Sequence, residues 1–255
     1  MRRLFRTASV LFTLTPFIVA FLRDRKSWVL FGRPARRSEG HHERRAGRLS
    51  ARLAALGPTF IKLAQLFSSR ADILPEPYLS EISKLQDQVP PDPPDEILKV
   101  IEQEEGAPVA ELFDEFRREP IAAASLGQVH GATVNGRPVV VKVLRPGVEK
   151  AVALDLDISF RLLFWLNILF PNHHIRALTN VVREFSVRVR AEMDFRQEAE
   201  NIAHFQRNFR NDRRVRAPDV LGDFTRRRVL VMEHCEGTKI DRLHDLFRSG
   251  RLSFK

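Results

Sequence analysis

The chain has 255 residues, enough for one large domain or two small ones, and its hydrophobic content of 44% is ordinary for a globular protein. Its one cysteine, Cys235, excludes an internal disulfide, and its net charge of +10 favours an anionic partner. Residues 1–50 hold 12 Lys and Arg against 3 Asp and Glu, a net of +9, so the charge belongs to an N-terminal arm.

An uncharged run of 15 residues, 8–22, lies in this arm between two groups of basic residues. It is shorter than the roughly 20 apolar residues of a membrane-spanning helix, it contains Pro16, and no signal-peptide cleavage site follows it. Two interpretations remain: a helix in the membrane interface, or a helix docked on this protein or on a partner. The sequence contains no DNA- or RNA-binding motif, so nucleic acid is not an expected partner.

Helices are expected between the arm and the first strands. Gly57-Pro58 opens one of them, because proline is well suited to the first helical turn. Its buried face is predicted from apolar residues at helical spacing: Phe60, Leu63, Ala64 and Phe67. The proline-rich residues 89–95 interrupt the chain, and a short helix follows over about 94–105.

A β-hairpin is the strongest local signal in the chain. Asn135-Gly136, which favours a type I′ turn, separates two β-rich runs. A two-residue turn here pairs Val129 with Lys142. It also places two glycines on the face of this lysine, where a ligand could lie against bare backbone: Gly127 and Gly131. The alternative is a weakly packed edge hairpin.

The second half of the chain is predicted to be mostly helical. Residues 148–170 form a buried or surface-docked helix, and residues 177–209 form a long helical region. Residues 217–237 then indicate a second hairpin with an apolar strand that ends at Met232-Glu233.

Glu198 interrupts the apolar stripe of the long helical region. It lies three residues after Phe195 and four before Ile202. Since a carboxylate on a buried face is costly unless a cation meets it, we expect a buried ion pair, with Lys142 as the cation.

The order of these elements is that of a protein-kinase N-lobe. In that lobe a small-residue turn covers the phosphates, and a strand lysine binds the α- and β-phosphates and pairs with a helix glutamate. The turn here is Ala122–Ala124. Alanine lets the backbone approach a ligand but lacks the freedom of glycine at positive φ, so we expect a stiffer turn than a glycine loop.

Five motifs in order resemble the UbiB/AarF (ADCK) family of atypical kinases. Residues 56–91 resemble its N-terminal signature, whose Lys-x-Gly-Gln core stands here as Lys62-Leu63-Ala64-Gln65. The others are the alanine-rich loop AAASLGQVH, the lysine strand VVVKVLRPGV, the Glu-x-Asp motif in EMDFRQEAEN and the hinge VLVMEHCEG.

The resemblance implies an ATP-binding kinase-like domain that uses Mg²⁺. It also implies a role in isoprenoid-quinone (ubiquinone) biosynthesis or related lipid metabolism, with quinone-biosynthesis proteins as partners, in a cytoplasmic protein peripherally attached to a membrane. Phosphate contacts are implied for Ala122, Ala123, Ala124, Ser125, Gly127 and Lys142, and adenine contacts for Met232, Glu233, His234 and Cys235. Catalytic roles are implied for Lys142, Glu198, Lys62, Gln65, Glu192 and Asp194.

Two departures from the family pattern stand out. Ala64 replaces the glycine of the signature. Only 20 residues, 236–255, follow the hinge, without a His-x-Asp loop or an Asp-Phe-Gly motif, whereas a C-lobe needs on the order of a hundred residues. We therefore expect a truncated reading frame or half of a split protein, inactive alone. The competing function is a non-catalytic membrane-associated scaffold or pseudokinase fragment.

The expected fold is α+β, a kinase-like N-lobe with a small antiparallel sheet, flanking helices and an N-terminal helical extension. Residues 1–50 would form the arm and linker, 51–110 the helical extension, 111–235 the N-lobe and 236–255 the start of the C-lobe. No metal site is expected, because the histidine pairs lack further ligands at metal spacing.

Overall fold

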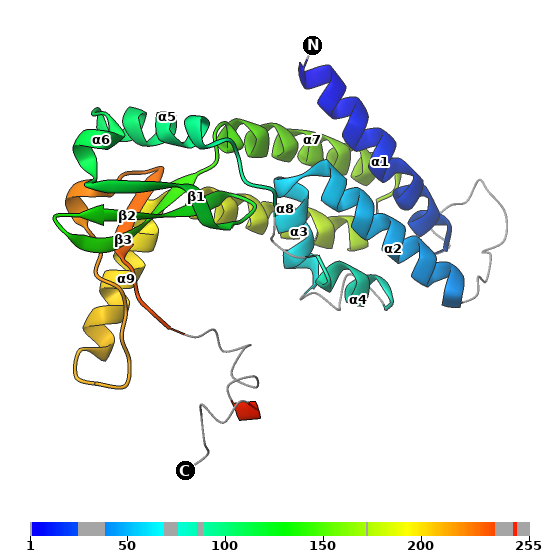
Figure 1. Cartoon of the computed structure of the whole chain (residues 1–255). Coiled ribbons are helices and arrows are strands. Elements are labelled where there is room, and N and C mark those ends of the chain that lie inside the picture. The colour runs from blue at the N-terminus through cyan, green and yellow to red at the C-terminus, as the bar shows by residue number, and fades with distance from the viewer. Residues whose placement is uncertain are drawn as a thin grey trace.

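The computed structural model describes residues 2–24, 39–68, 76–85, 89–171, 173–237 and 247–248. It consists of a small antiparallel sheet with flanking helices, beside a separate cluster of helices (Figure 1). This is the α+β fold class that the sequence predicts. Most of residues 236–255 lie outside the described residues, as do 25–38 of the predicted arm and linker.

The sheet has four antiparallel strands in the order β1-β2-β3-β4. Its register confirms the predicted hairpin, since Val129 lies opposite Lys142. Asn135 and Gly136 have φ values of 49° and 71°, as a type I′ turn requires. The strands are β1 (Glu115–Ala123), β2 (Gly127–Val134), β3 (Arg137–Leu144) and β4 (Val229–Glu233).

Both faces of the sheet are covered. On one face, alternate valines of β3 and β4 pack with α5 (Pro94–Glu105) and α6 (Val109–Leu112) in one apolar core. On the other face, Leu144 and Leu230 belong to a second core that includes α7 (Val148–Leu169), α8 (His173–Glu192) and the start of α9 (Phe195–Phe209). Because side chains alternate along a strand, Lys142 lies on this second face while Val141 and Val143 are fully buried on the first.

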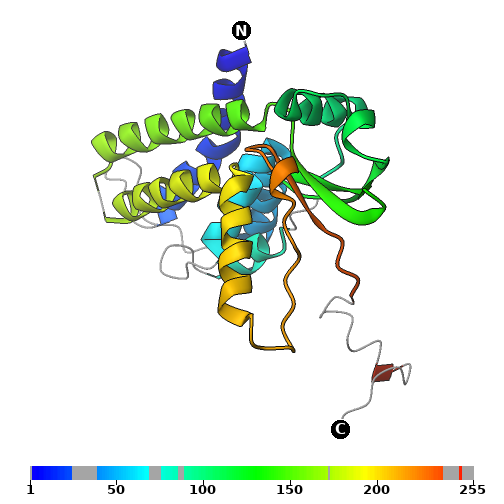
Figure 2. The ribbon, with the colours of Figure 1, turned by 90° about the vertical axis from the view of Figure 1, so that its left-hand side faces the viewer.

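The helical cluster contains α2 (Glu39–Leu56), α3 (Pro58–Ser68), α4 (Tyr78–Ser83), α7 (Val148–Leu169) and α8 (His173–Glu192). The helices over 94–105 and 148–170 and the start at Pro58 are confirmed. Figure 2 shows α7 and α8 side by side, with α9 (Phe195–Phe209) turning sharply away from α8.

The N-terminal run forms helix α1 (Arg2–Asp24), which docks on α2 and α7. Val10 is fully buried, and Arg6 donates two hydrogen bonds of 2.7 Å to Asp155 and one of 2.6 Å to Leu56 O. The interpretation of a helix docked on this protein is therefore correct for one face of α1. Among the described helices, α1 alone is long and apolar enough, over Arg3–Ala20, to cross a membrane by length and composition.

The long helical region predicted over 177–209 is divided into two helices. The chain leaves α8 after Glu192 and restarts at Phe195, where Asp194 caps α9 by accepting a hydrogen bond from Arg196 N. Aspartate favours this capping position, which explains the break. The predicted second hairpin is also reduced, to one bridge between Val220 and Met232 beside β4.

The two glycines on the lysine face differ in their surroundings. Side chains of β1 cover Gly131, so the predicted open space is absent there: a Cβ would lie 3.2 Å from Arg117 Cδ. At Gly127 a Cβ would lie only 2.8 Å from the carbonyl oxygen of Val143. This oxygen belongs to the backbone of β3, so it cannot move away without distorting the strand.

Gly127→Ala should therefore lower the free energy of unfolding by about 1–3 kcal/mol, the range found for overpacked sites. Gly131→Ala is the matched control and should change it by less than about 1 kcal/mol, because the arginine side chain can move. Urea unfolding of the two variants measures both values. Equal destabilisation by the two substitutions would contradict the distinction.

Candidate functional site

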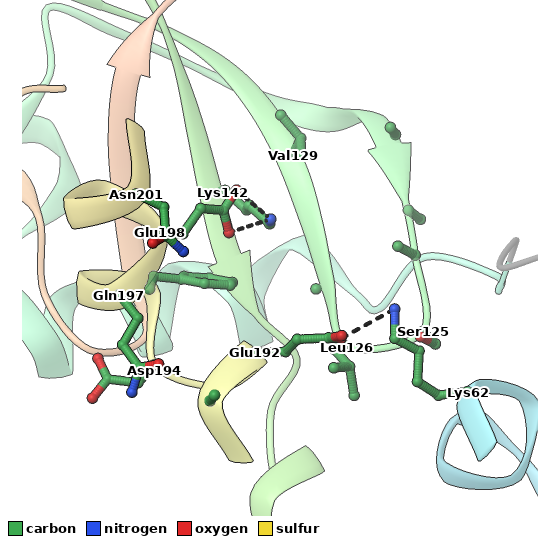
Figure 3. Close-up of a pocket in the computed structure, with 16 residues that line it drawn as sticks. Lys62, Ser125, Leu126, Val129, Lys142, Glu192, Asp194, Gln197, Glu198 and Asn201 are labelled. Carbon is green, nitrogen blue, oxygen red and sulfur yellow. Dashed lines mark hydrogen bonds and ion pairs between the residues drawn. The ribbon is translucent and has the colours of Figure 1, made fainter. Parts of the chain in front are cut away.

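A pocket of about 480 Å³ lies between the lysine face of the sheet, α3 and the junction of α8 with α9 (Figure 3). It brings together ten residues that the sequence singled out: Lys62, Ala122, Ala123, Ala124, Ser125, Gly127, Lys142, Glu192, Asp194 and Glu198. They come from six helices and strands, the turn after β1 and the junction of α8 with α9, so the fold gathers groups that are far apart in the sequence.

Lys142 and Glu198 form an ion pair across this pocket (Figure 3). The Nζ atom of Lys142 donates to both carboxylate oxygens, at 2.8 and 2.6 Å. The predicted partnership is present, but the predicted burial is wrong, because the two side chains are 29% and 37% exposed. Water screens such a pair, so its contribution to stability is small, and both charges remain accessible to a ligand.

The aromatic ring of Phe195 lies next to the ammonium group of Lys142. This ring, which is buried, has its centroid 5.0 Å from Lys142 Nζ, within the range of a cation–π contact. The sequence placed Phe195 in an apolar stripe and missed this contact. The sequence feature that could have predicted it is the position of Phe195 three residues before Glu198, which places both side chains on one side of α9.

A second ion pair joins the helical cluster to the pocket. Lys62 of α3 lies with its Nζ 3.1 Å from Glu192 Oε2, at the end of α8 (Figure 3). Lys62 lies one turn before Gln65, which is half-buried and does not line the pocket.

Asp194 is already held by a cation. Arg196 donates to both of its carboxylate oxygens, at 2.9 and 2.7 Å, as well as through its backbone N–H. These bonds, above all the side-chain hydrogen bond from Arg196, lower the pKa of Asp194 and keep it ionised at neutral pH. The carboxylate faces the pocket, but a metal ion would compete with the guanidinium for it.

The turn after β1 is fixed by a buried arginine that the sequence did not single out. Arg145, whose side chain is 7% exposed, donates through Nε to Ala124 O at 2.8 Å. Its Nη1 donates to Asp92 at 2.8 Å, and its Nη2 donates to the carbonyl oxygens of Val89 and Pro90 at 3.2 and 2.9 Å. The only sequence feature that pointed to Arg145 is the presence of a charged residue directly after an apolar strand.

The same segment is bound to β2. Asp92 N donates to the side-chain oxygen of Gln128 at 2.9 Å, and Gln128 lies 3.0 Å from the fully buried ring of His130. Burial lowers the pKa of His130, against the opposing effect of its hydrogen bond with Arg117 O. The ring is therefore neutral at neutral pH, and the polar side chains beneath the turn are hydrogen-bonded.

The turn itself requires no glycine at its alanines. Ala124 N donates to Gly127 O at 2.8 Å, which closes the turn into β2. Within the described ranges, Asn135 is the only residue other than glycine with a positive φ, so Ala122, Ala123 and Ala124 adopt ordinary backbone conformations.

The four hinge residues do not line the pocket. Met232 lies opposite Val140 and hence on the lysine face, where it packs partly buried against the second core. Glu233 pairs with Arg216, the backbone N–H of His234 bonds to Pro138 O, and the Cys235 side chain is exposed.

In the part of the chain that the structure describes, no group of three or more His, Cys, Asp or Glu is placed to hold a metal ion. The carboxylates that line the pocket, Glu192, Asp194 and Glu198, are each paired with a cation. The described residues therefore do not provide a complete set of magnesium ligands.

Residues 84–251 match the family model of the ABC1 atypical kinase-like domain. The chain belongs to the UbiB/ABC1 family of atypical kinases. The chain is 38% identical over 237 residues to "Probable protein kinase UbiB" of Marinobacter nauticus, covering 92% of this chain and 42% of that protein. It is also 38% identical over 234 residues to "Protein ACTIVITY OF BC1 COMPLEX KINASE 7, chloroplastic" of Arabidopsis thaliana, covering 91% and 34%.

A solved structure shares the fold. It is titled the complex structure of Rv3197-erythromycin from Mycobacterium tuberculosis, with 28% identity and a TM-score of 0.53, and it covers 83% of this chain and 52% of that chain. The resemblance to UbiB/AarF kinases read from the sequence is thus confirmed. The chain spans less than half the length of the two named relatives.

Replacing Arg145 should destabilise the fold strongly. Arg145→Met leaves the Asp92 carboxylate and three carbonyl oxygens without their donor, so the free energy of unfolding should fall by about 3–5 kcal/mol. Arg188→Met, which removes an exposed arginine from a pair with Glu184 on α8, should cost only about 0.3–0.5 kcal/mol. Urea unfolding compares the two, and similar costs would rule out the bracing role of Arg145.

Proposed function

We propose that the pocket around Lys142 binds ATP and that the chain is the nucleotide-binding part of a UbiB-type atypical kinase or ATPase. The observation that carries this proposal is the accessible ion pair of Lys142 and Glu198 opposite a small-residue turn. A strand lysine held by a helix glutamate is the device by which kinases grip the α- and β-phosphates.

The residues around Lys142 have defined roles in this proposal. Lys142 contacts the phosphates, and Glu198 orients the ammonium group while leaving it open to the ligand. Ala122–Ser125 and Gly127 allow close approach of the phosphates, because their side chains are small. Met232–Cys235, at the end of β4 and directly after it, would contact the adenine, since β4 pairs with the strand that carries Lys142.

The second ion pair would control access to the nucleotide. Lys62 and Glu192 join α3 to the end of α8 at the same pocket, so α3 forms one wall of the ligand site. Gln65 lies on the following turn of α3 and does not line the pocket. It would affect access to the nucleotide only by helping to fix the position of this helix. Bound magnesium neutralises phosphate charge in kinases, but the described residues do not complete its coordination.

The cellular role proposed for the whole protein is support of ubiquinone (isoprenoid-quinone) biosynthesis or lipid metabolism at a membrane. The support is family membership together with relatives named UbiB. Attachment would be peripheral, from the cytoplasmic side, through the exposed apolar side chains of α1, among them Leu4, Phe5 and Phe12. Quinone-biosynthesis proteins are the partners this role implies.

A non-catalytic membrane-associated scaffold is the second candidate function. The observation in its favour is the exposed apolar surface of α7, which carries Phe164, Trp165, Ile168 and Leu169. Contiguous exposed apolar surface marks interaction sites in soluble proteins. Nucleotide binding separates the two candidates, because a scaffold does not need the pocket.

Lys142→Met should weaken ATP binding by about 10- to 150-fold, the value of one charge-assisted hydrogen bond of about 1.5–3 kcal/mol. Lys99→Met, at an exposed position on α5, is the matched control and should leave binding unchanged. Glu198→Ala should also weaken binding, while lowering stability by less than about 1 kcal/mol, because the pair is partly exposed. Titration calorimetry measures the affinities. Equal affinity of Lys142→Met and the parent would exclude the phosphate role.

The membrane role of α1 has a separate test. Phe5→Asp and Phe12→Asp together should reduce binding to anionic vesicles by about tenfold or more, because each aromatic ring loses its burial in the interface. Phe205→Asp, an exposed position on α9, should have no such effect. Co-sedimentation measures binding, which should fall as salt rises. Unchanged binding of the double variant would remove α1 as the attachment site.

A further inference from the structure

A second cavity lies inside the helical cluster and takes no part in the pocket around Lys142. Its volume is about 250 Å³, and it is lined by side chains of α1, α2, α3, α4, α7 and α8. Apolar cavities of about 150 Å³ in other proteins already remain dry and bind benzene. The space is therefore large enough for part of an apolar ligand.

The lining is almost entirely hydrocarbon. Ser159 is the single polar side chain among the described residues that line the cavity, and its hydroxyl donates to Asp155 O of its own helix at 2.7 Å. A ligand with polar groups would lose its bonds to water in this cavity without replacement, which is costly. The chemistry of the lining thus selects a hydrocarbon chain.

The lining contains both buried and half-buried side chains, so the cavity reaches the surface. Phe17 and Ile18 of α1 and Leu162 and Leu166 of α7 are among the half-buried ones. The cavity can therefore be reached from the surface at α1 and α7, which lie next to each other in Figure 1.

The surface around this route is suited to a bilayer. Trp165 and Leu169 lie three residues after the lining residues Leu162 and Leu166, so they border them on α7, and they are 59% and 63% exposed. Tryptophan is enriched where proteins meet the membrane interface. On α1, the exposed apolar side chains Phe5, Phe12 and Val19 recur every seven residues as one stripe, on the opposite side of the helix from the residues that line the cavity.

We propose that this cavity binds the hydrocarbon chain of a membrane lipid, which enters between α1 and α7. The chemistry is that of a long acyl or polyprenyl chain, and the cavity offers no partner for a headgroup, which would stay at the surface. The cavity is separate from the Lys142 pocket, so chain binding and nucleotide binding can succeed or fail independently.

The test uses the whole chain bound to vesicles of phosphatidylethanolamine and phosphatidylglycerol. One arm contains a phospholipid with a diazirine in its acyl chain, and the other contains a diazirine-bearing geranylgeraniol. After irradiation, crosslinked positions are mapped by mass spectrometry. The expected result is labelling at Leu178 and Val182 of α8, which line the cavity. Labelling from either arm supports the proposal and identifies the source of the chain.

Variants that fill the cavity provide the control. Leu166→Trp should reduce labelling of Val182 by about tenfold or more, because the indole takes the space of several methylenes. Leu178→Trp fills the same space from α8 and should act likewise. Ile168→Trp, at an exposed position on the same helix as Leu166 that does not line the cavity, should leave the labelling unchanged. Circular dichroism confirms that each variant is folded.

Three outcomes would overturn the proposal. Labelling confined to exposed positions such as Phe12 and Ile168 would show that lipid meets only the surface of the helices. Labelling of Val182 that is equal in Leu166→Trp and in the parent would place the chain elsewhere. Absence of labelling in both arms would mean that the cavity is closed to lipid, for example by residues of this chain.

Discussion

The guanidinium of Arg145 is the interaction on which the arrangement of the pocket depends. It is buried at the end of β3, and its donors bind the turn after β1, the carboxylate of Asp92 and two carbonyl oxygens of the proline-rich segment. A buried charge is tolerated only when it is paired and hydrogen-bonded, so these segments must meet at one point. The sheet, the turn and the chain leading from the helical cluster are held together there, beside the strand that carries Lys142.

The pocket then follows from alternation along one strand and a break between two helices. The side chains of Val141 and Val143 are buried in the core beneath α5, so Lys142 lies on the opposite face of the sheet. The break before Phe195 ends α8 with Glu192 at the pocket and starts α9 with Glu198 near the lysine. Packing thus determines where the charges lie, and the charges remain accessible because they line a hollow rather than a core.

The sequence predicted the features that depend on local patterns and on motifs in order. The register of the β2–β3 hairpin followed from two turn residues, and the partnership of Lys142 with Glu198 followed from a carboxylate in an apolar stripe. It did not predict the exposure of that pair, because exposure depends on what packs nearby. Arg145 was missed for the same reason: its acceptors come from segments separated by 21 to 56 residues along the chain. Whether the nucleotide roles of the pocket residues are correct stays a prediction.

The alanines of the turn have one further consequence, which concerns conformational entropy. An alanine side chain has no rotamers to lose, and an alanine backbone visits fewer conformations than glycine in the unfolded chain. With Ala124 bound through its carbonyl oxygen to Arg145 and through its N–H to Gly127 O, the turn is ordered when the protein folds. The turn then loses little conformational entropy when a ligand binds. The entropy cost of ordering it falls on folding and not on binding.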